Sequence, residues 1–77
     1  MELQEPERLW KVVVTDTARA FYEFLSNRDL LLSSREQVKS VFSVWREKRP
    51  QKCPSFSETL FSMSRLKLCR VEDGQVL

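Results

Sequence analysis

The sequence predicts a mainly α-helical domain in which three helices are followed by a C-terminal β-hairpin. Two stretches carry apolar residues at helical spacing, and Ser-x-x-Glu boxes of the kind that begin helices lie at residues 33–36 and 55–58. Near the C-terminus the apolar residues alternate instead, and Asp73-Gly74 is a typical two-residue hairpin turn. The alternative is an all-α helical bundle, in which the last segment would stay helical.

The first helix is expected over residues 6–26. Pro6 suits the first turn of a helix, where acidic neighbours also suit the positive end of the helix dipole. Placed 100° apart, its apolar residues fall on one arc that should face the core: Leu9, Trp10, Val13, Val14, Thr17, Ala20, Phe21, Phe24 and Leu25. Val12 and Tyr22 lie off this arc, and we expect them at the surface.

The second helix is expected over residues 34–49, with Ser33 as its cap. Pro50 should end it, because the residue before a proline avoids the helical conformation. Its apolar stripe consists of Val38, Val41, Phe42, Val44 and Trp45. We expect both tryptophans, Trp10 and Trp45, to lie in the core.

The third helix is expected over residues 55–65, after a five-residue connection at 50–54. Its core face consists of Phe56, Leu60 and Met63. Phe61 lies at the border of this face, where it would either close the core or anchor in a pocket of a partner. One residue from each helix should meet in the core, namely Phe24, Phe42 and Leu60.

Two shorter segments remain. Residues 30–32, all leucine, are too few to assign by periodicity and are either a loop folded onto the core or a short strand. Residues 66–70 are expected to form a strand that returns through the Asp-Gly turn. The expected pairs are Val71 with Val76 and Arg70 with Leu77.

Composition argues against catalysis. The chain has no histidine, which removes the commonest general base and metal ligand, and it has no glycine-rich phosphate loop. The cysteines, Cys53 and Cys69, are too few for a disulfide framework or a zinc site. We therefore expect no enzyme activity, no cofactor and no metal.

Length and apolar content indicate one small domain over residues 1–77, and whether it is a piece of a larger protein is left open. No apolar run approaches the roughly 18 residues of a membrane span. The first residues are acidic, unlike a signal peptide, so we expect an intracellular location, in the nucleus or the cytoplasm.

Charge is uneven along the chain. Residues 33–70 hold nine basic and three acidic residues, whereas the whole chain has a net charge of +2. This asymmetry suggests nucleic acid as one candidate partner, bound through Lys39, Arg46, Lys48, Arg49, Lys52, Lys67 and Arg70. The densest run, residues 46–52, would contact phosphates or act as a nuclear localisation signal. It could equally be an ordinary helix end, where cations suit the dipole.

The predicted order of helix, short strand, helix, turn, helix and hairpin resembles the winged helix-turn-helix superfamily. The resemblance implies that the third helix docks in the DNA major groove and that the hairpin, residues 70–75, forms the wing. The exposed candidates on the third helix are Ser57, Glu58, Phe61, Ser62 and Arg65. Two features depart from a DNA-binding wing: the third helix has few base-reading side chains, and Glu72 and Asp73 make the wing tip acidic.

Because many winged helices bind proteins instead, we expect an interaction module that binds a protein partner within a larger intracellular complex. Its contact residues would be Glu58, Phe61, Ser62 and Arg65. The alternative is a nucleic-acid-binding domain that uses the basic segment 35–70. The sequence does not indicate an oligomeric state.

Overall fold

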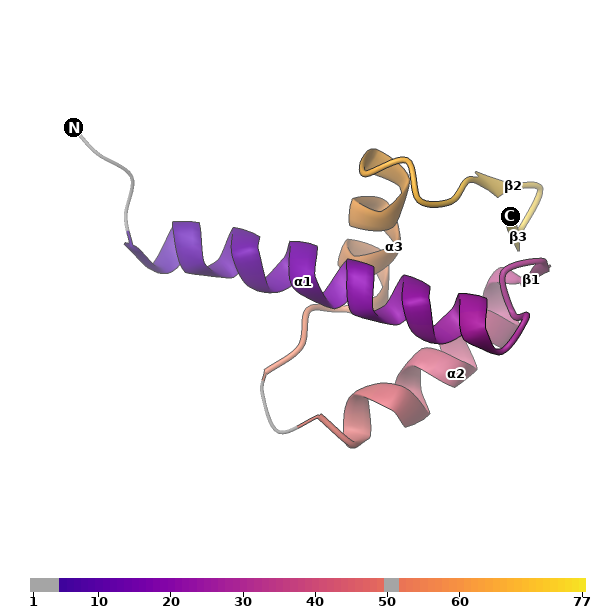
Figure 1. Ribbon diagram of the computed structural model, residues 1–77, viewed down its shortest axis with the longest axis horizontal. Helices are drawn as coiled ribbons and strands as arrows, with labels where there is room; N and C mark the ends of the chain where they lie inside the picture. The colour runs from indigo at the N-terminus through magenta and orange to yellow at the C-terminus, as the bar shows by residue number, and fades with distance from the viewer. Residues whose placement is uncertain (1–4, 50–51) are drawn as a thin grey trace.

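The computed structural model describes residues 5–49 and 52–77. Its elements, in chain order, are α1 (Glu5–Asn27), β1 (Ser33–Ser34), α2 (Arg35–Glu47), α3 (Phe56–Arg65), β2 (Val71–Glu72) and β3 (Gln75–Val76). The predicted mainly α-helical domain with a C-terminal hairpin is confirmed, and its element order is winged-helix-like. α1 is the longest element, and its N-terminal end projects beyond α2 and α3 (Figure 1). Residues 2–4, Pro50 and Gln51, which the sequence analysis used, lie outside the described residues.

The starts of α2 and α3 follow from serine caps. The Ser55 Oγ accepts a hydrogen bond from the Glu58 backbone N–H at 3.2 Å, and the Glu58 carboxylate accepts one from the Ser55 N–H, which completes the predicted box. At α2 the predicted cap is wrong by one residue. Ser34, rather than Ser33, accepts from the Gln37 N–H at 3.1 Å, because α2 begins at Arg35 and Ser34 is the residue directly before it.

Helices α1 and α3 end in the same way. After α1, the Leu30 N–H donates to the Leu25 carbonyl at 2.9 Å, and Asp29 between them has a φ of 57°. After α3, the Leu68 N–H donates to the Met63 carbonyl at 3.0 Å, and Lys67 has a φ of 62°. Both ends are Schellman motifs, in which one left-handed residue reverses the chain.

The strand predicted over residues 66–70 is therefore wrong. Leu66 is the C-cap of α3, and the Schellman turn occupies the residues that follow it, so the first strand of the hairpin is only Val71–Glu72. The alternation of leucines around Lys67 reflects a helix end, in which Leu66 and Leu68 both turn back toward the body of the domain and are half-buried.

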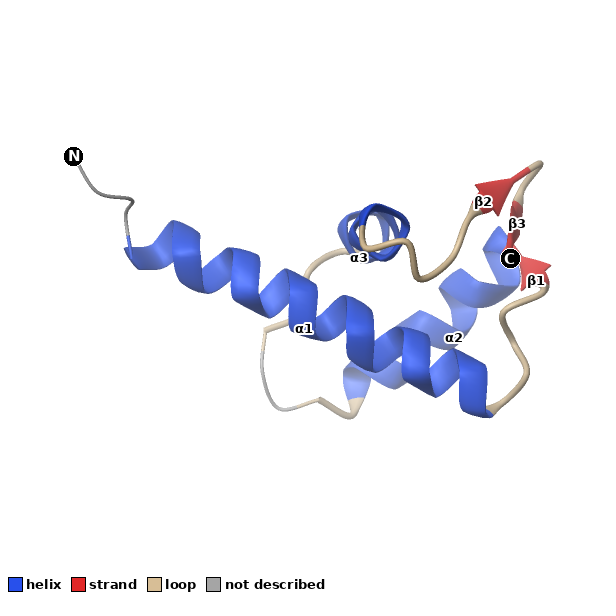
Figure 2. Ribbon diagram, turned by 45° about the horizontal axis from the view of Figure 1, so that its top comes forward, coloured by secondary structure: helices blue, strands red, loops and turns tan. Residues whose placement is uncertain are grey.

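The three strands form one antiparallel sheet in the order β1-β3-β2. Val76 of β3 pairs with Val71, as predicted, and also with Ser33 of β1. Arg70 and Leu77 exchange two backbone hydrogen bonds, at 3.0 and 2.7 Å, which confirms that predicted pair. Figure 2 shows the sheet where α1 ends and α2 begins.

The tip of the hairpin is tied to α2. Asp73 and Gly74 have φ values of 50° and 77°, the combination of a type I′ turn. The Gly74 carbonyl accepts a hydrogen bond from the backbone N–H of Arg35, the first residue of α2, at 2.6 Å.

The short strand between α1 and α2 is Ser33–Ser34, directly after the leucines that the sequence left unassigned. Residues 30–32 form a loop in which Leu30 and Leu31 pack on the core, while Leu32 is 78% exposed.

The core is centred on aromatic rings from all three helices. The centroid of the Phe21 ring lies 5.0 Å from that of Phe42, which in turn lies 5.6 Å from that of Phe56. Phe42 and Leu60 are buried as predicted, but Phe24 is only half-buried, and Phe21 takes its place at the centre. The other buried apolar residues are Ala18, Leu25, Val38, Cys53, Met63, Cys69 and Val76.

Several apolar residues lie elsewhere than predicted. Leu9, expected on the core arc of α1, is 60% exposed. Val44, expected in the core stripe of α2, is 58% exposed. Tyr22, expected at the surface, packs against the core. The Trp45 ring of α2 contacts both Phe21 and Phe24 of α1, and α3 also packs on α1. Near its C-terminal end, α1 therefore buries a wider face than the predicted arc.

We expect the Phe21→Ala variant to lose about 3–5 kcal/mol of unfolding free energy, the usual cost of emptying a buried aromatic site. The matched control, Val44→Ala, should change stability by no more than about 0.5 kcal/mol, since that side chain is exposed. Urea denaturation followed by circular dichroism measures both. Similar losses in the two variants would contradict this assignment of the core.

The left-handed residue after α3 gives a second prediction. Lys67→Gly should raise the unfolding free energy by about 1 kcal/mol, because glycine adopts a positive φ without steric cost. Lys48→Gly is the matched control: this C-cap of α2 has a φ of −90°, so glycine there relieves nothing and should lower stability. The same denaturation curves test the pair, and a loss in the Lys67 variant would refute the prediction.

Candidate functional site

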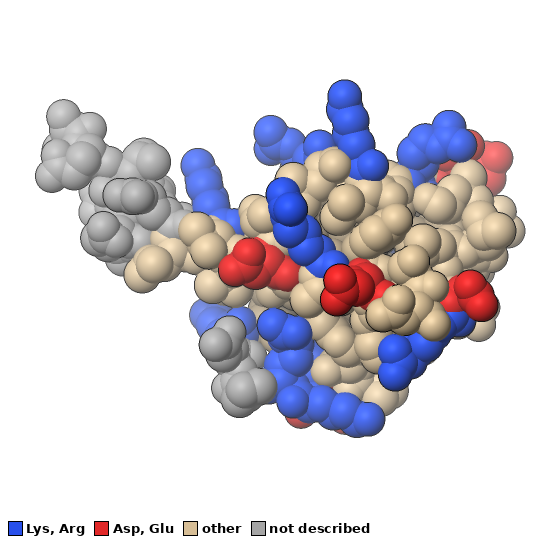
Figure 3. Space-filling view, viewed as in Figure 1, with Lys and Arg blue, Asp and Glu red and all other residues tan. Residues whose placement is uncertain are grey.

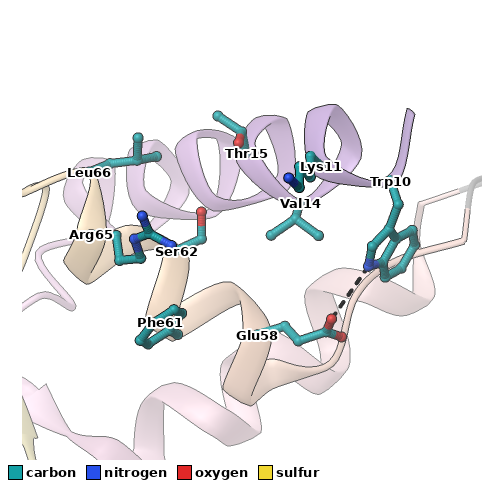
Figure 4. A pocket seen from close by; sticks show the side chains of 9 residues that line it. All are labelled: Trp10, Lys11, Val14, Thr15, Glu58, Phe61, Ser62, Arg65 and Leu66. Carbon is teal, nitrogen blue, oxygen red and sulfur yellow. Dashed lines mark hydrogen bonds between the residues drawn. The ribbon is translucent and has the colours of Figure 1, made fainter. Parts of the chain in front are cut away.

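A surface groove of about 520 Å³ runs between the N-terminal half of α1 and the exposed side of α3. We call it the α1–α3 groove, and Figure 4 shows its side chains. They are Trp10, Lys11, Val14, Thr15, Glu58, Phe61, Ser62, Arg65 and Leu66.

The groove has a half-buried apolar floor and an exposed, mixed rim. Val14 points from α1 toward α3, and Leu66 lies at the C-terminal end of α3 (Figure 4). Phe61, on α3, is 64% exposed, which is unusual for an aromatic side chain. The Arg65 guanidinium carbon lies 5.8 Å from the centroid of the Phe61 ring, within cation–π range.

Trp10 and Glu58 close one end of the groove. The Trp10 Nε1–H donates to Glu58 Oε2 at 3.4 Å, and the other carboxylate oxygen accepts from the backbone N–H and the hydroxyl of Ser55. One carboxylate therefore both completes the cap of α3 and ties α3 to α1. The prediction that Trp10 belongs to the core is wrong: its ring is half-buried and lines the groove, whereas Trp45 packs against the core as expected.

The four residues predicted to contact a partner all line this groove, namely Glu58, Phe61, Ser62 and Arg65. Ser57, the other candidate on α3, is exposed but outside it. Sequence reasoning missed the contribution of α1. Lys11 and Thr15 fall on the side of α1 opposite its predicted core arc, and only the crossing of α3 makes them walls of a groove.

The residues proposed for nucleic acid do not form one surface together with α3. Arg46, Lys48, Arg49 and Lys52 gather at the C-terminal end of α2 and beyond it, Lys67 and Arg70 follow α3, and Lys39 is on α2. The C-terminal ends of α2 and α3 lie on opposite sides of the molecule in Figure 1, and Figure 3 shows acidic side chains between the basic ones.

Several of these cations already contact aromatic rings or a carboxylate within the domain. The Arg49 guanidinium carbon lies 4.6 Å from the centroid of a Trp45 ring, and that of Arg46 lies 5.8 Å from the Phe42 centroid. Arg70 forms an ion pair with Glu72 at 3.4 Å, in which both side chains are largely exposed. An exposed pair of this kind contributes little stability, but it lowers the positive charge of the wing.

Two observations bear on metal binding and thiol reactivity in the part of the chain that the structure describes. Its Cys, Asp and Glu side chains form no group of three that could hold a metal ion. Burial raises the pKa of the Cys69 thiol above its ordinary value, which disfavours the reactive thiolate. Within the same residues, no helix is long and apolar enough to cross a bilayer.

Comparison with known proteins adds one match. Residues 14–77 fit the family model described as "Helicase MOV-10, N-terminal". No curated protein sequence and no solved structure is significantly similar to the chain. The match includes the whole α3 side of the groove, while Trp10 and Lys11 precede it. Because it spans most of the 77 residues, the chain belongs to the MOV-10 helicase N-terminal family.

Proposed function

We propose that this domain is a non-enzymatic interaction module of winged helix-turn-helix type, which binds a protein partner through the α1–α3 groove within a larger intracellular complex. The observation that carries the proposal is the 64% exposure of Phe61 beside a groove with a partly apolar floor. Aromatic and arginine side chains dominate the energetics of protein interfaces, and Phe61 and Arg65 lie together here.

The exposed side of α3 supports a protein partner more than DNA. A helix that reads bases needs arginine, lysine, asparagine or glutamine at the positions facing the groove of the duplex. On α3 the exposed residues include Glu58, Phe61 and a single arginine, Arg65. The Glu58 carboxylate would face the phosphates with a like charge, and so would Asp73 at the tip of the wing.

Membership of a family defined by the N-terminal region of a helicase also supports the proposal. A domain with no metal-binding group of side chains in its described residues would serve such a protein by binding rather than by catalysis. The α3 side of the groove lies inside the matched segment, so the proposed contact surface is largely a part of the family domain.

Nucleic-acid binding through segment 35–70 is the second candidate. The exposed cations Arg46, Lys48 and Lys52 at the end of α2 favour it, since phosphates bind such clusters without base contacts. Lys52 also lies beside Trp10 of the groove, whereas Arg46 and Lys48 are not among the residues that line it, so only Arg46 and Lys48 distinguish the two functions.

The groove is tested by substitution at its exposed aromatic ring. Phe61→Ala should weaken the capture of bound proteins from cell extract by immobilised domain, because the ring supplies the apolar contact, and should leave the melting temperature nearly unchanged. Val44→Ala removes an equally exposed apolar side chain from α2 and is the matched control. Quantitative mass spectrometry should find proteins lost with the Phe61 variant and retained with the control. Equal retention by both variants would exclude the groove.

The second candidate is tested by titration with a random DNA duplex. Four cations acting together give a salt slope of roughly 3–4, so binding should be weak and should collapse between low and physiological salt. Charge reversal by Arg46→Glu and Lys48→Glu, both outside the groove, should abolish what binding remains, whereas Phe61→Ala should not affect it. Tight binding that persists at physiological salt would favour nucleic acid as the principal partner.

A further inference from the structure

We infer that the occupant of the α1–α3 groove is an acidic segment of a partner protein, which places bulky apolar side chains against Trp10 and Phe61 and carboxylates beside them. The inference rests on the proposed function and adds the chemistry of the partner to it. The observation that supports it is that cationic side chains alternate with apolar surface along the groove.

A cation lies beside each of the two aromatic rings of the groove, although only Arg65 of the two cations lines the groove itself. At one end the Lys52 ammonium lies 5.7 Å from the centroid of the Trp10 ring. At the other end the Arg65 guanidinium carbon lies 5.8 Å from the centroid of the Phe61 ring. Figure 4 shows Trp10 and Arg65 at opposite ends, with Val14 between them. A segment lying along the groove would therefore meet a cation beside an apolar surface twice.

The cations are available for a partner. Lys11 adds a third positive charge on the α1 wall. Among the side chains that the structure describes, no carboxylate lies within ion-pair distance of Lys11, Lys52 or Arg65. A long cationic side chain covers apolar surface with its stem while its head stays hydrated, so Lys52 and Arg65 can each receive a partner carboxylate without leaving their rings.

Among the described residues that line the groove, the single acidic group is already occupied. The Glu58 carboxylate accepts hydrogen bonds from the Trp10 indole and from the N–H and hydroxyl of Ser55. A basic segment would have to compete for this carboxylate and would meet three cations of like sign. An acidic segment gains three attractions and leaves the cap of α3 intact, so electrostatic complementarity selects it.

Nucleic acid satisfies only half of these contacts. Its phosphates could pair with the three cations, but a backbone offers no bulky apolar group for Val14 and Leu66. Bases could stack on Phe61, yet they would also bring phosphates next to Glu58. The alternation of ring and cation therefore fits a peptide better than a nucleic acid.

The test begins with a random linear peptide library displayed on phage and selected on the intact domain. Selection on the Phe61→Ala variant in parallel removes sequences that bind elsewhere. We expect the remaining peptides to be enriched in Asp and Glu next to Leu, Phe or Trp. Enrichment in Lys and Arg, no charge preference, or no peptides specific to the intact groove would each overturn the inference.

The strongest enriched peptide is then synthesised and titrated into a Trp45→Phe variant, in which Trp10 is the remaining indole. Binding should change the Trp10 emission. Arg65→Glu should weaken binding about tenfold, because it replaces an attraction by a repulsion, and exchanging the acidic residues of the peptide for lysine should restore part of the loss. Lys48→Glu makes the same charge change outside the groove and should have little effect.

Two outcomes separate this inference from the proposed function. If captured proteins depend on Phe61 but the peptides show no acidic preference, the groove binds a partner and the inferred chemistry is wrong. If neither captured proteins nor selected peptides depend on Phe61, the proposed function is wrong as well.

Discussion

The contact between the rings of Phe21 and Phe42 sets the geometry of the domain. Their centroids lie 5.0 Å apart with planes inclined by 77°, an edge-to-face arrangement that joins α1 to α2. Phe56 packs on the same Phe42 ring and brings the start of α3 into the core, and Val76 adds the sheet. α1 and α3 also pack directly on each other, and the α1–α3 groove lies beside this contact.

Sequence alone predicted the features that depend on local chemistry. The cap of α3, the Asp-Gly turn and the core face of Phe56, Leu60 and Met63 are read from neighbouring residues, and the structure has them as expected. The four α3 residues singled out from their helical positions also line one groove. Periodicity could not show which neighbour each face would meet. Trp10 lies on the predicted core arc but projects beyond the core, and only the position of α3 makes it a groove residue.

The failures at element ends have a related cause. A Schellman turn is usually recognised by glycine, yet α1 and α3 end with Asp29 and Lys67 in the left-handed position. With no glycine to mark the helix end, the leucines after α3 suggested a strand. The strand β1 was equally hidden, because Ser33 and Ser34 have the composition of a helix cap and are extended through pairing with β3. The residues around Ser33 and Ser34 give no sign that they pair with strand β3 near the C-terminus.

The hydrogen bond from Arg35 to Gly74 makes the hairpin part of the α2 cap. The first N–H groups of a helix have no partner within it, and here the turn between β2 and β3 supplies one for α2. Opening the hairpin would expose that donor together with the buried side chain of Val76, so the wing and the start of α2 should open as one cooperative unit. In hydrogen exchange, their amides would share one protection free energy. The hairpin is thus tied to the helical core both through the cap of α2 and through Val76.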